Sequence, residues 1–384
     1  TRSALAMQLM ERLIRAAVAR GAQSIHIKAK DVFRARIHNE LVPLSETPFT
    51  PDETRQIALE LLPNETFRRR IDEIWDLDFA YELQDLARFR VNILQQRGSF
   101  MVVLRTIPWR VPTLEELNLP LVLSKIADEP HGMVLVTGAT GVGKSTTQAA
   151  MISWINHNRK KHIITLEDPI EYWHDNHMST ITQREIGSDT ESFRRGLRQA
   201  LRQDPDIILI GEMRDLETTE IAVEAAETGH LVISTMHAPT TTGALKHLFG
   251  MFPEQHEELV RFRVADTLRG IVSQRLARTS DGNGTVPAME VMRVTPAIRD
   301  CILRGETQTE IVELIQNGRQ QYGMQTFDQH LMDLVEDGQV SYETALEMAS
   351  NPSDFELHMR TLREDQEKYS KTAEDGLLTG GSRF

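Results

Sequence analysis

The stretch "MVLVTGATGVGKSTTQAAMISWI" (residues 133–155) decides the fold of this chain. An apolar run is followed by a glycine-rich turn, and the turn is followed by residues that favour a helix. The turn, "GATGVGKST" (138–146), fits the Walker A pattern G-x-x-x-x-G-K-[ST]. In this pattern the glycines let backbone amides wrap phosphates, the lysine reaches the β- and γ-phosphates, and the hydroxyl contacts Mg²⁺. A chance glycine-rich turn is the alternative, and the predicted strand and helix on either side count against it.

The turn therefore predicts a binding site for ATP and Mg²⁺. The residues predicted to bind the nucleotide are Gly138, Thr140, Gly141, Gly143, Lys144, Ser145 and Thr146. Among them, Ser145 is the predicted contact of the metal ion.

Three further short apolar runs each end in polar residues. They are "HIITLED" (162–168), "DIILIGE" (206–212) and "LVISTMH" (231–237). Such runs, with helical stretches between them, are typical of strands buried on both faces of a parallel sheet. Ligands of an open parallel sheet lie beyond the carboxyl ends of its strands. We therefore expect Glu167, Glu212 and His237 on the same edge of the sheet as the glycine-rich turn.

Two of these residues are carboxylates, which hydrolysis of ATP requires. One carboxylate positions or deprotonates the attacking water, and another helps to hold Mg²⁺ through its water molecules. We predict Glu212 as the base, and both Glu167 and Glu212 as carboxylates that hold water molecules of Mg²⁺. The alternative is that each is a surface carboxylate at the end of a strand.

Two histidines bracket one apolar run in "ETGHLVISTMHA" (227–238), a pairing that often indicates a metal site. On a strand, seven steps of about 3.3 Å place the Cα atoms of His230 and His237 roughly 23 Å apart. Zinc ligands lie about 2.1 Å from the ion, so one strand cannot bring both histidines to one metal. The odd separation also sends the two side chains to opposite faces of the sheet.

Arginines recur in the N-terminal region. Arg88 and Arg90 alternate along a predicted strand, so both guanidinium groups face the same side, and Arg105 lies on the next strand. ATP hydrolysis by ring-shaped motors often uses a cation from a neighbouring subunit. Either these arginines form a solvated basic face, or they reach a phosphate across a subunit boundary.

The patterns predict an α/β protein with an N-terminal α+β domain. Within that domain, a helix covers residues 3–20, the stretch 24–44 is expected to form one hairpin with "HNE" as its turn, and Thr50 begins a second helix. The predicted parts are the α+β domain (1–107), a proline-containing linker (108–120), the ATPase core (121–294), a helical region (295–362) and a polar, disordered tail (363–384).

Composition and charge narrow the class of protein. The 384 residues are 40% hydrophobic and 26% charged, and no stretch has the 18 or more apolar residues of a membrane span, so we expect a cytoplasmic protein. The single cysteine, Cys301, excludes a disulfide framework and a cysteine-rich zinc module. The net charge is −13, and residues 301–384 carry −9 of it, from 16 acidic and 7 basic residues. This charge disfavours nucleic acid as a partner.

Five segments together resemble the secretion-type ATPases and, within them, the type IV pilus retraction ATPases (PilT/PilU, twitching motility). The segments are "GATGVGKSTT", "ITLEDPIEY", "TQREIG", "LRQDPDIILIGEMRDLET" and "TGHLVISTMHA", and the resemblance covers roughly residues 5–362. It implies a PAS-like N-terminal domain, a RecA-like ATPase domain with C-terminal helices, and a homohexamer that binds nucleotide between domains and neighbours.

The resemblance also implies roles for single residues. It makes Glu212 the catalytic glutamate of the Walker B segment and places Glu167 in the segment known as the Asp box. Arg88, Arg90 and Arg105 resemble the phosphate-facing arginines of the family. The resemblance implies that the two histidines do not bind a metal ion. His237 is instead expected to report on the γ-phosphate, and His230 to act as a polar relay. A hydrogen-bonded structural histidine is the alternative for His230.

The branch of the family follows from two further features. Assembly ATPases commonly carry a four-cysteine zinc insert, which one cysteine cannot supply. Retraction ATPases carry an "AIRNLI" helix, and residues 297–302 read "AIRDCI", with Asp300 and Cys301 at the differing positions. The resemblance thus implies a motor at the cytoplasmic side of the inner membrane that pulls on a pilus platform protein, with a paralogous retraction ATPase as a further candidate partner.

Two alternatives to a retraction motor stay open. One is a secretion or pilus-assembly ATPase, and the other is a low-turnover, nucleotide-dependent accessory module. The presence of Lys144, Ser145, Glu167 and Glu212 argues against the accessory module, because an inactive relative is expected to lose some of them.

Overall fold

The computed structural model describes residues 2–37, 40–83, 86–107, 110–305 and 308–361. The expected disordered tail (363–384) lies outside these residues. By its contacts the chain divides into two compact units, residues 1–111 with 162–204, and residues 112–161 with 205–384. The domain boundaries expected from the sequence remain a prediction. Within the described residues, no helix is both long and apolar enough to cross a membrane.

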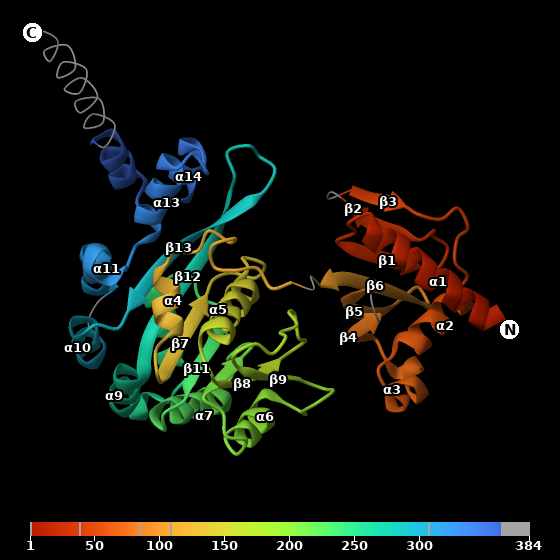
Figure 1. Cartoon of the computed structure of the whole chain (residues 1–384), viewed down its shortest axis with the longest axis horizontal. Coiled ribbons are helices and arrows are strands. Elements are labelled where there is room, and N and C mark those ends of the chain that lie inside the picture. The colour runs from red at the N-terminus through yellow and green to blue at the C-terminus, as the bar shows by residue number, and fades with distance from the viewer. Residues whose placement is uncertain (1, 38–39, 84–85, 108–109, 306–307, 362–384) are drawn as a thin grey trace, which may run out of the picture. The chain divides into compact units, whose positions relative to one another are not determined.

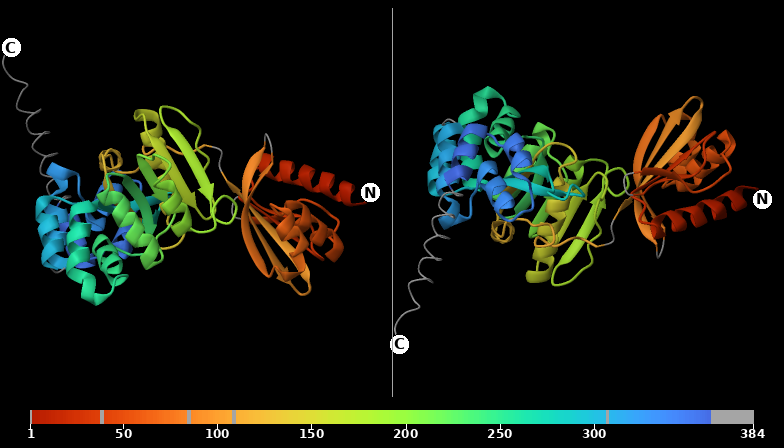
Figure 2. Two further views of the ribbon diagram at one scale, coloured as in Figure 1. Left: turned by 90° about the horizontal axis from the view of Figure 1, so that it is seen from below. Right: turned by 90° about the horizontal axis from the view of Figure 1, so that it is seen from above.

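A six-stranded antiparallel sheet forms the centre of the first unit, with strand order β3-β2-β1-β6-β5-β4. Its strands are β1 Ser24–Lys28, β2 Arg34–Ile37, β3 Glu40–Pro43, β4 Asp76–Leu83, β5 Ala87–Gln96 and β6 Ser99–Ile107. The helices α1 Arg2–Ala19, α2 Pro51–Leu61 and α3 Glu65–Arg69 lie on one face of this sheet (Figure 2). Alternate residues of β5 are buried, as expected for a sheet with one covered face.

The hairpin expected in residues 24–44 is confirmed in part: β2 and β3 pair in antiparallel register up to Ile37 and Glu40, but residues 24–37 form two strands, β1 and β2, instead of one arm. Lys30 leaves the strand with φ of 61°, and its amide donates to the carbonyl of Phe49. That bond ends β1 and separates it from β2. The "HNE" turn lies partly outside the described residues. The predicted start of α2 is confirmed: Thr50 and Glu53 form a capping box.

The second sheet has seven strands in the order β13-β12-β7-β11-β10-β8-β9. They are β7 Gly132–Thr137, β8 His162–Glu167, β9 Thr180–Glu185, β10 Ile207–Ile210, β11 Leu231–Met236, β12 Leu268–Arg278 and β13 Thr285–Arg293. The four apolar runs are confirmed as strands β7, β8, β10 and β11, and every residue of β7 and β11 is buried. Strands β7, β10 and β11 are parallel, as expected.

Strands β9 and β12–β13 are not among the predicted strands. β12 lies parallel to β7, and β13 is its antiparallel partner. The sequence of β12, "LRGIVSQRLAR", carries polar residues at buried positions, so it lacks the continuous apolar run that marks the other strands.

Helices surround these strands and follow them (Figure 1). They are α4 Val122–Ala127, α5 Lys144–Asn158, α6 Phe193–Ala200, α7 Leu216–Glu227, α8 Thr241–Gly250, α9 Glu257–Thr267, α10 Pro296–Arg304, α11 Gln308–Asn317, α12 Arg319–Tyr322, α13 Phe327–Glu336 and α14 Tyr342–Met348. The mostly helical C-terminal region is thereby confirmed. Apolar side chains of α13, including Phe327 and Leu331, pack against Ala277 and Ala288 of the β12–β13 pair.

Candidate active site

The glycine-rich turn joins β7 to α5. Gly138, Gly141 and Gly143 have φ of 144°, 80° and 90°, a range that favours glycine. A Cβ on Gly138 would lie 2.5 Å from the carbonyl oxygen of Gln274, so a residue larger than glycine would also clash at this position. The backbone amides of the turn lead directly into α5, which is 15 residues long. Loop amides and a helix N-terminus together suit a bound phosphate.

Lys144 begins α5, and its side chain lies across the turn. The side chain is almost fully buried, and Nζ donates to the carbonyl oxygens of Gly138 at 3.0 Å and Ala139 at 2.8 Å. The ammonium group is therefore held at the turn by acceptors that a phosphate oxygen can replace. Ser145 and Thr146 follow in the first turn of α5, and Thr140 is exposed on the loop.

Glu212 and His237 are brought together at the carboxyl ends of neighbouring strands. Glu212 follows β10 and His237 follows β11, and the two strands pair in parallel register. His237 Nε2 lies 2.9 Å from Glu212 Oε1, and Arg214 Nη2 lies 2.6 Å from Glu212 Oε2. The expected common edge is thus observed for these two residues. Arg214 was missed by sequence reasoning, although its position two residues after Glu212 was a usable signal.

The charges around Glu212 determine its protonation. Burial alone would raise the pKa of Glu212. The hydrogen bond from Arg214 and the electrostatic attraction of Arg214, His237 and Lys144 outweigh burial, so the pKa lies below its ordinary value. Glu212 is therefore a carboxylate at neutral pH and can accept a proton.

Glu167 ends β8 in the first unit. Its Oε1 accepts hydrogen bonds from Thr165 Oγ1 at 2.6 Å and from Gln183 Nε2 at 3.3 Å. Burial raises the pKa of Glu167 to about 7, although these hydrogen bonds lower it. Without a nearby cation, the Glu167 carboxyl is thus close to half protonated at neutral pH.

The three arginines lie on β5 and β6 of the first unit. Arg90 stands directly opposite Arg105 in the antiparallel register, and Arg105 is exposed. Arg90 pairs with Asp78 at 3.8 Å and with Glu171 at 3.6 Å.

Arg88 differs from the other two because its side chain is only 11% exposed. It pairs with Glu185 at 3.6 Å, and its guanidinium carbon lies 4.7 Å from the ring centre of Trp173. The simple alternative of one solvated basic face therefore does not describe Arg88. Contact of any of the three with phosphate remains a prediction.

His230 precedes β11 at the end opposite His237. Its Nδ1 lies 2.9 Å from the carbonyl oxygen of Ala225 and 3.3 Å from Thr228 Oγ1. Its own carbonyl accepts a hydrogen bond from the amide of Gly132 at 2.9 Å. His230 thus joins the end of α7 to the starts of β7 and β11. These contacts suit either a relay or a structural histidine, so both interpretations stay open.

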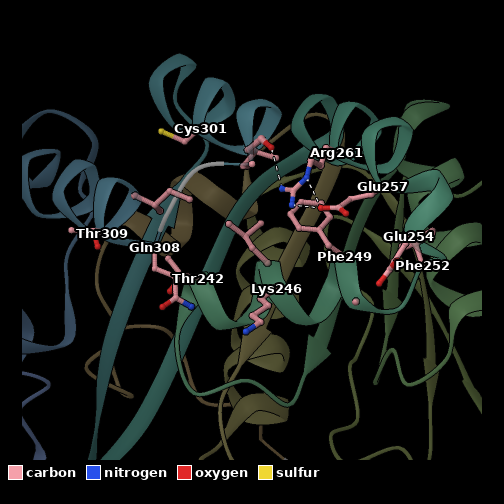
Figure 3. A pocket seen from close by; sticks show the side chains of 15 residues that line it. Thr242, Lys246, Phe249, Phe252, Glu254, Glu257, Arg261, Cys301, Gln308 and Thr309 are labelled. Atoms are coloured by element: carbon pink, nitrogen blue, oxygen red, sulfur yellow. Dashed lines mark hydrogen bonds and ion pairs between the residues drawn. The ribbon is translucent and has the colours of Figure 1, made fainter.

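A cavity of about 800 Å³ lies among α8, α9, α10 and α11 (Figure 3). Arg261 lies over the ring of Phe249, with 4.6 Å from the guanidinium carbon to the ring centre, and pairs with Glu257. Cys301 and Ile302 of the "AIRDCI" segment also line this cavity. None of its lining residues is a predicted nucleotide contact, so the cavity is separate from the glycine-rich turn.

Comparisons with known proteins identify the family of this chain. The sequence profile of the family "Type II/IV secretion system protein" matches residues 1–351. The type IV pilus ATPase PilU of Pseudomonas aeruginosa is 40% identical over 96% of this chain and 95% of its own length. The type IV pilus retraction ATPase PilT of the same organism is 40% identical over 87% of this chain and 96% of its own length.

A solved structure supports the same relationship. The crystal structure of the pilus retraction motor PilT with bound ADP superimposes with a TM-score of 0.82 at 38% identity, covering 90% of this chain and 98% of that chain. The expected fold class, an N-terminal domain followed by a RecA-like ATPase domain, is confirmed by this match. This chain therefore belongs to the family of type II/IV secretion system proteins.

Proposed function

We propose that this chain is an ATP-hydrolysing motor that drives retraction of type IV pili, and with it twitching motility. The observation that carries the proposal is the grouping of Glu212 with His237 and Arg214 at strand ends, within reach of the charge of Lys144. The similarity to PilT and PilU over nearly their whole lengths supports the retraction branch over secretion, pilus assembly or an accessory role.

The nucleotide is held by the turn between β7 and α5. Amides of Gly141 and Gly143 and the start of α5 surround its phosphates, and Lys144 exchanges its carbonyl acceptors for phosphate oxygens. Within the described residues, no group of three or more His, Cys, Asp and Glu can hold a metal ion. The Ser145 hydroxyl would hold Mg²⁺ together with phosphate oxygens and water, which are ligands usual for this ion. When bound, it neutralises charge on the phosphates.

Glu212 accepts a proton from the attacking water. Its lowered pKa keeps it ionised, and Arg214 and His237 hold both carboxylate oxygens in place. His237 would link this carboxylate to the γ-phosphate, and the role proposed for Glu167 is to hold water molecules of the metal ion when nucleotide is bound. A cation near Glu167 would favour its ionised form.

Assembly completes the site. We place the chain in a homohexamer in which Arg88, Arg90 and Arg105 serve nucleotide bound by a neighbouring subunit. The hexamer works at the cytoplasmic side of the inner membrane and pulls on the pilus platform protein, alone or with a paralogous retraction ATPase. The acidic C-terminal helices suit a basic loop of that partner.

The proposal is tested in cells by counting surface pili and measuring twitching. A deletion strain and a strain with Lys144→Ala are compared with the parent. We expect more surface pili and lost twitching in both strains. Bare cells would assign the protein to assembly instead, and an effect of the deletion without an effect of Lys144→Ala would favour the accessory module.

A further inference from the structure

Gln274 lies beside the glycine-rich turn although it comes 130 positions after Lys144 in the sequence. It belongs to β12, where Ser273 is the register partner of Thr137, the last residue of β7. Gln274 therefore continues the strand just where β7 passes into the turn. Its side chain is 2% exposed.

Both ends of the Gln274 side-chain amide are used. Nε2 donates to the carbonyl oxygen of Val142 in the turn, and Oε1 accepts from Thr147 Oγ1 in α5 at 2.8 Å. The carbonyl of Val142 requires the NH₂ group, which leaves the amide oxygen for the hydroxyl of Thr147, so the network itself fixes the amide orientation. One side chain thus joins the turn to the first turns of the helix.

The bond to Val142 sets the orientation of one peptide plane. In a trans peptide, the carbonyl and the following N–H point in opposite directions. Because the Val142 carbonyl points to Gln274, the N–H of Gly143 points away from β12. Loop amides of this kind are the groups that bind phosphate in a glycine-rich turn.

The main chain of β12 supports the same turn at its start. The carbonyl oxygen of Gln274 leaves no space for a Cβ on Gly138. Next to it, Ser273 Oγ lies 2.5 Å from Thr137 Oγ1. Strand β12 therefore contacts the turn at its beginning, at Val142 and at the helix that follows.

We propose that Gln274 is a positioning residue for nucleotide binding, which orients the Gly143 amide toward the phosphates through its bond to Val142. The inference rests on the proposed nucleotide site at the turn. It adds a residue that the sequence motifs do not mark, since Gln274 lies outside all five of them.

The test is the affinity for ADP of the full-length variant Gln274→Met, measured with a fluorescent ADP analogue. Methionine keeps the length of the side chain and removes both hydrogen bonds. We expect the Kd for ADP to rise about tenfold, as for the loss of about one net hydrogen bond. The KM for ATP should rise by a similar factor, with kcat changed less.

Gln325→Met is the matched control. Gln325 is also buried and also donates through Nε2 to a backbone carbonyl, that of Met289 at 3.0 Å. Met289 lies on β13, which β12 separates from β7 in the sheet. We expect Gln325→Met to leave the Kd for ADP unchanged even where it lowers thermal stability.

Thr147→Val serves if Gln274→Met does not fold, because it removes the hydrogen bond that holds the Gln274 amide at Oε1 and so weakens the hold of Nε2 on Val142. It should raise the Kd about threefold. The role of Gln274 would be overturned if the folded variants Gln274→Met or Thr147→Val bound ADP as tightly as the parent. An equal rise of the Kd for ADP in Gln325→Met would overturn it too. Lys144→Ala distinguishes the two proposals: if that variant binds ADP like the parent, the turn is not the nucleotide site and the proposed function fails on its own.

Discussion

Acid should destabilise the packing of α13 against β13 through His330. This side chain is 7% exposed, and its Nδ1 accepts a hydrogen bond from the amide of Met289 at 2.9 Å. Burial lowers the pKa of His330 to about 4, from 6.5 for the free side chain. The unfolded chain therefore binds more protons than the folded chain below pH 6.5, so stability falls as the pH drops from 6.5 toward 4.

The magnitude follows from the two pKa values. Between pH 7.5 and pH 5, the linkage removes about 2 kcal/mol from the free energy of unfolding. Urea unfolding at both pH values measures this change. His330→Gln keeps an acceptor for the Met289 amide but does not titrate, and should reduce the pH dependence by about that amount. His358→Gln, at an exposed position in the same unit, is the matched control. An unchanged pH dependence in His330→Gln would refute the reasoning.

Three further predictions concern other parts of the chain. Gly138→Ala should destabilise the protein by more than about 1 kcal/mol in thermal unfolding, because its φ is 144° and its Cβ would meet the Gln274 carbonyl. Gly282→Ala should cost less, because φ is 71° there and the space around the new Cβ is open. Cys301 is 1% exposed, and burial raises the pKa of its thiol. The thiol should therefore resist a disulfide reagent until urea unfolds the chain. Rapid labelling of the native protein would contradict this prediction. Arg88→Ala should lower ATP turnover at the neighbouring subunit's site in mixed hexamers. Unchanged turnover at that site would contradict a role of Arg88 in hydrolysis by the neighbour.

Local patterns in the sequence predicted much of the fold. The glycine-rich turn and four apolar runs predicted β7, β8, β10 and β11, because strands buried on both faces need continuous apolar residues. Thr50 and Glu53 likewise predicted the start of α2, because a capping box lies within four residues of sequence. The placement of Glu212 and His237 on one edge of the sheet followed from the rule for parallel strand ends, whereas their direct contact is seen only in the structure.

Other features depend on contacts between distant segments. The β12–β13 pair was missed because its polar residues are satisfied by partners that the sequence does not reveal, such as Thr147 for Gln274. The ion pair between Arg88 and Glu185 joins segments 97 residues apart. The extra strand in residues 24–44 arises from the bond between Lys30 and Phe49, which no local pattern marks.

The most direct test of the proposed chemistry is Glu212→Gln in the full-length protein, with ATP turnover and nucleotide affinity measured on the same preparation. The variant keeps the size of the side chain and loses the carboxylate that accepts the proton. We expect turnover to fall at least about 100-fold, with the Kd for nucleotide within about twofold of the parent. Near-parental hydrolysis in Glu212→Gln would contradict the assignment of Glu212 as the base.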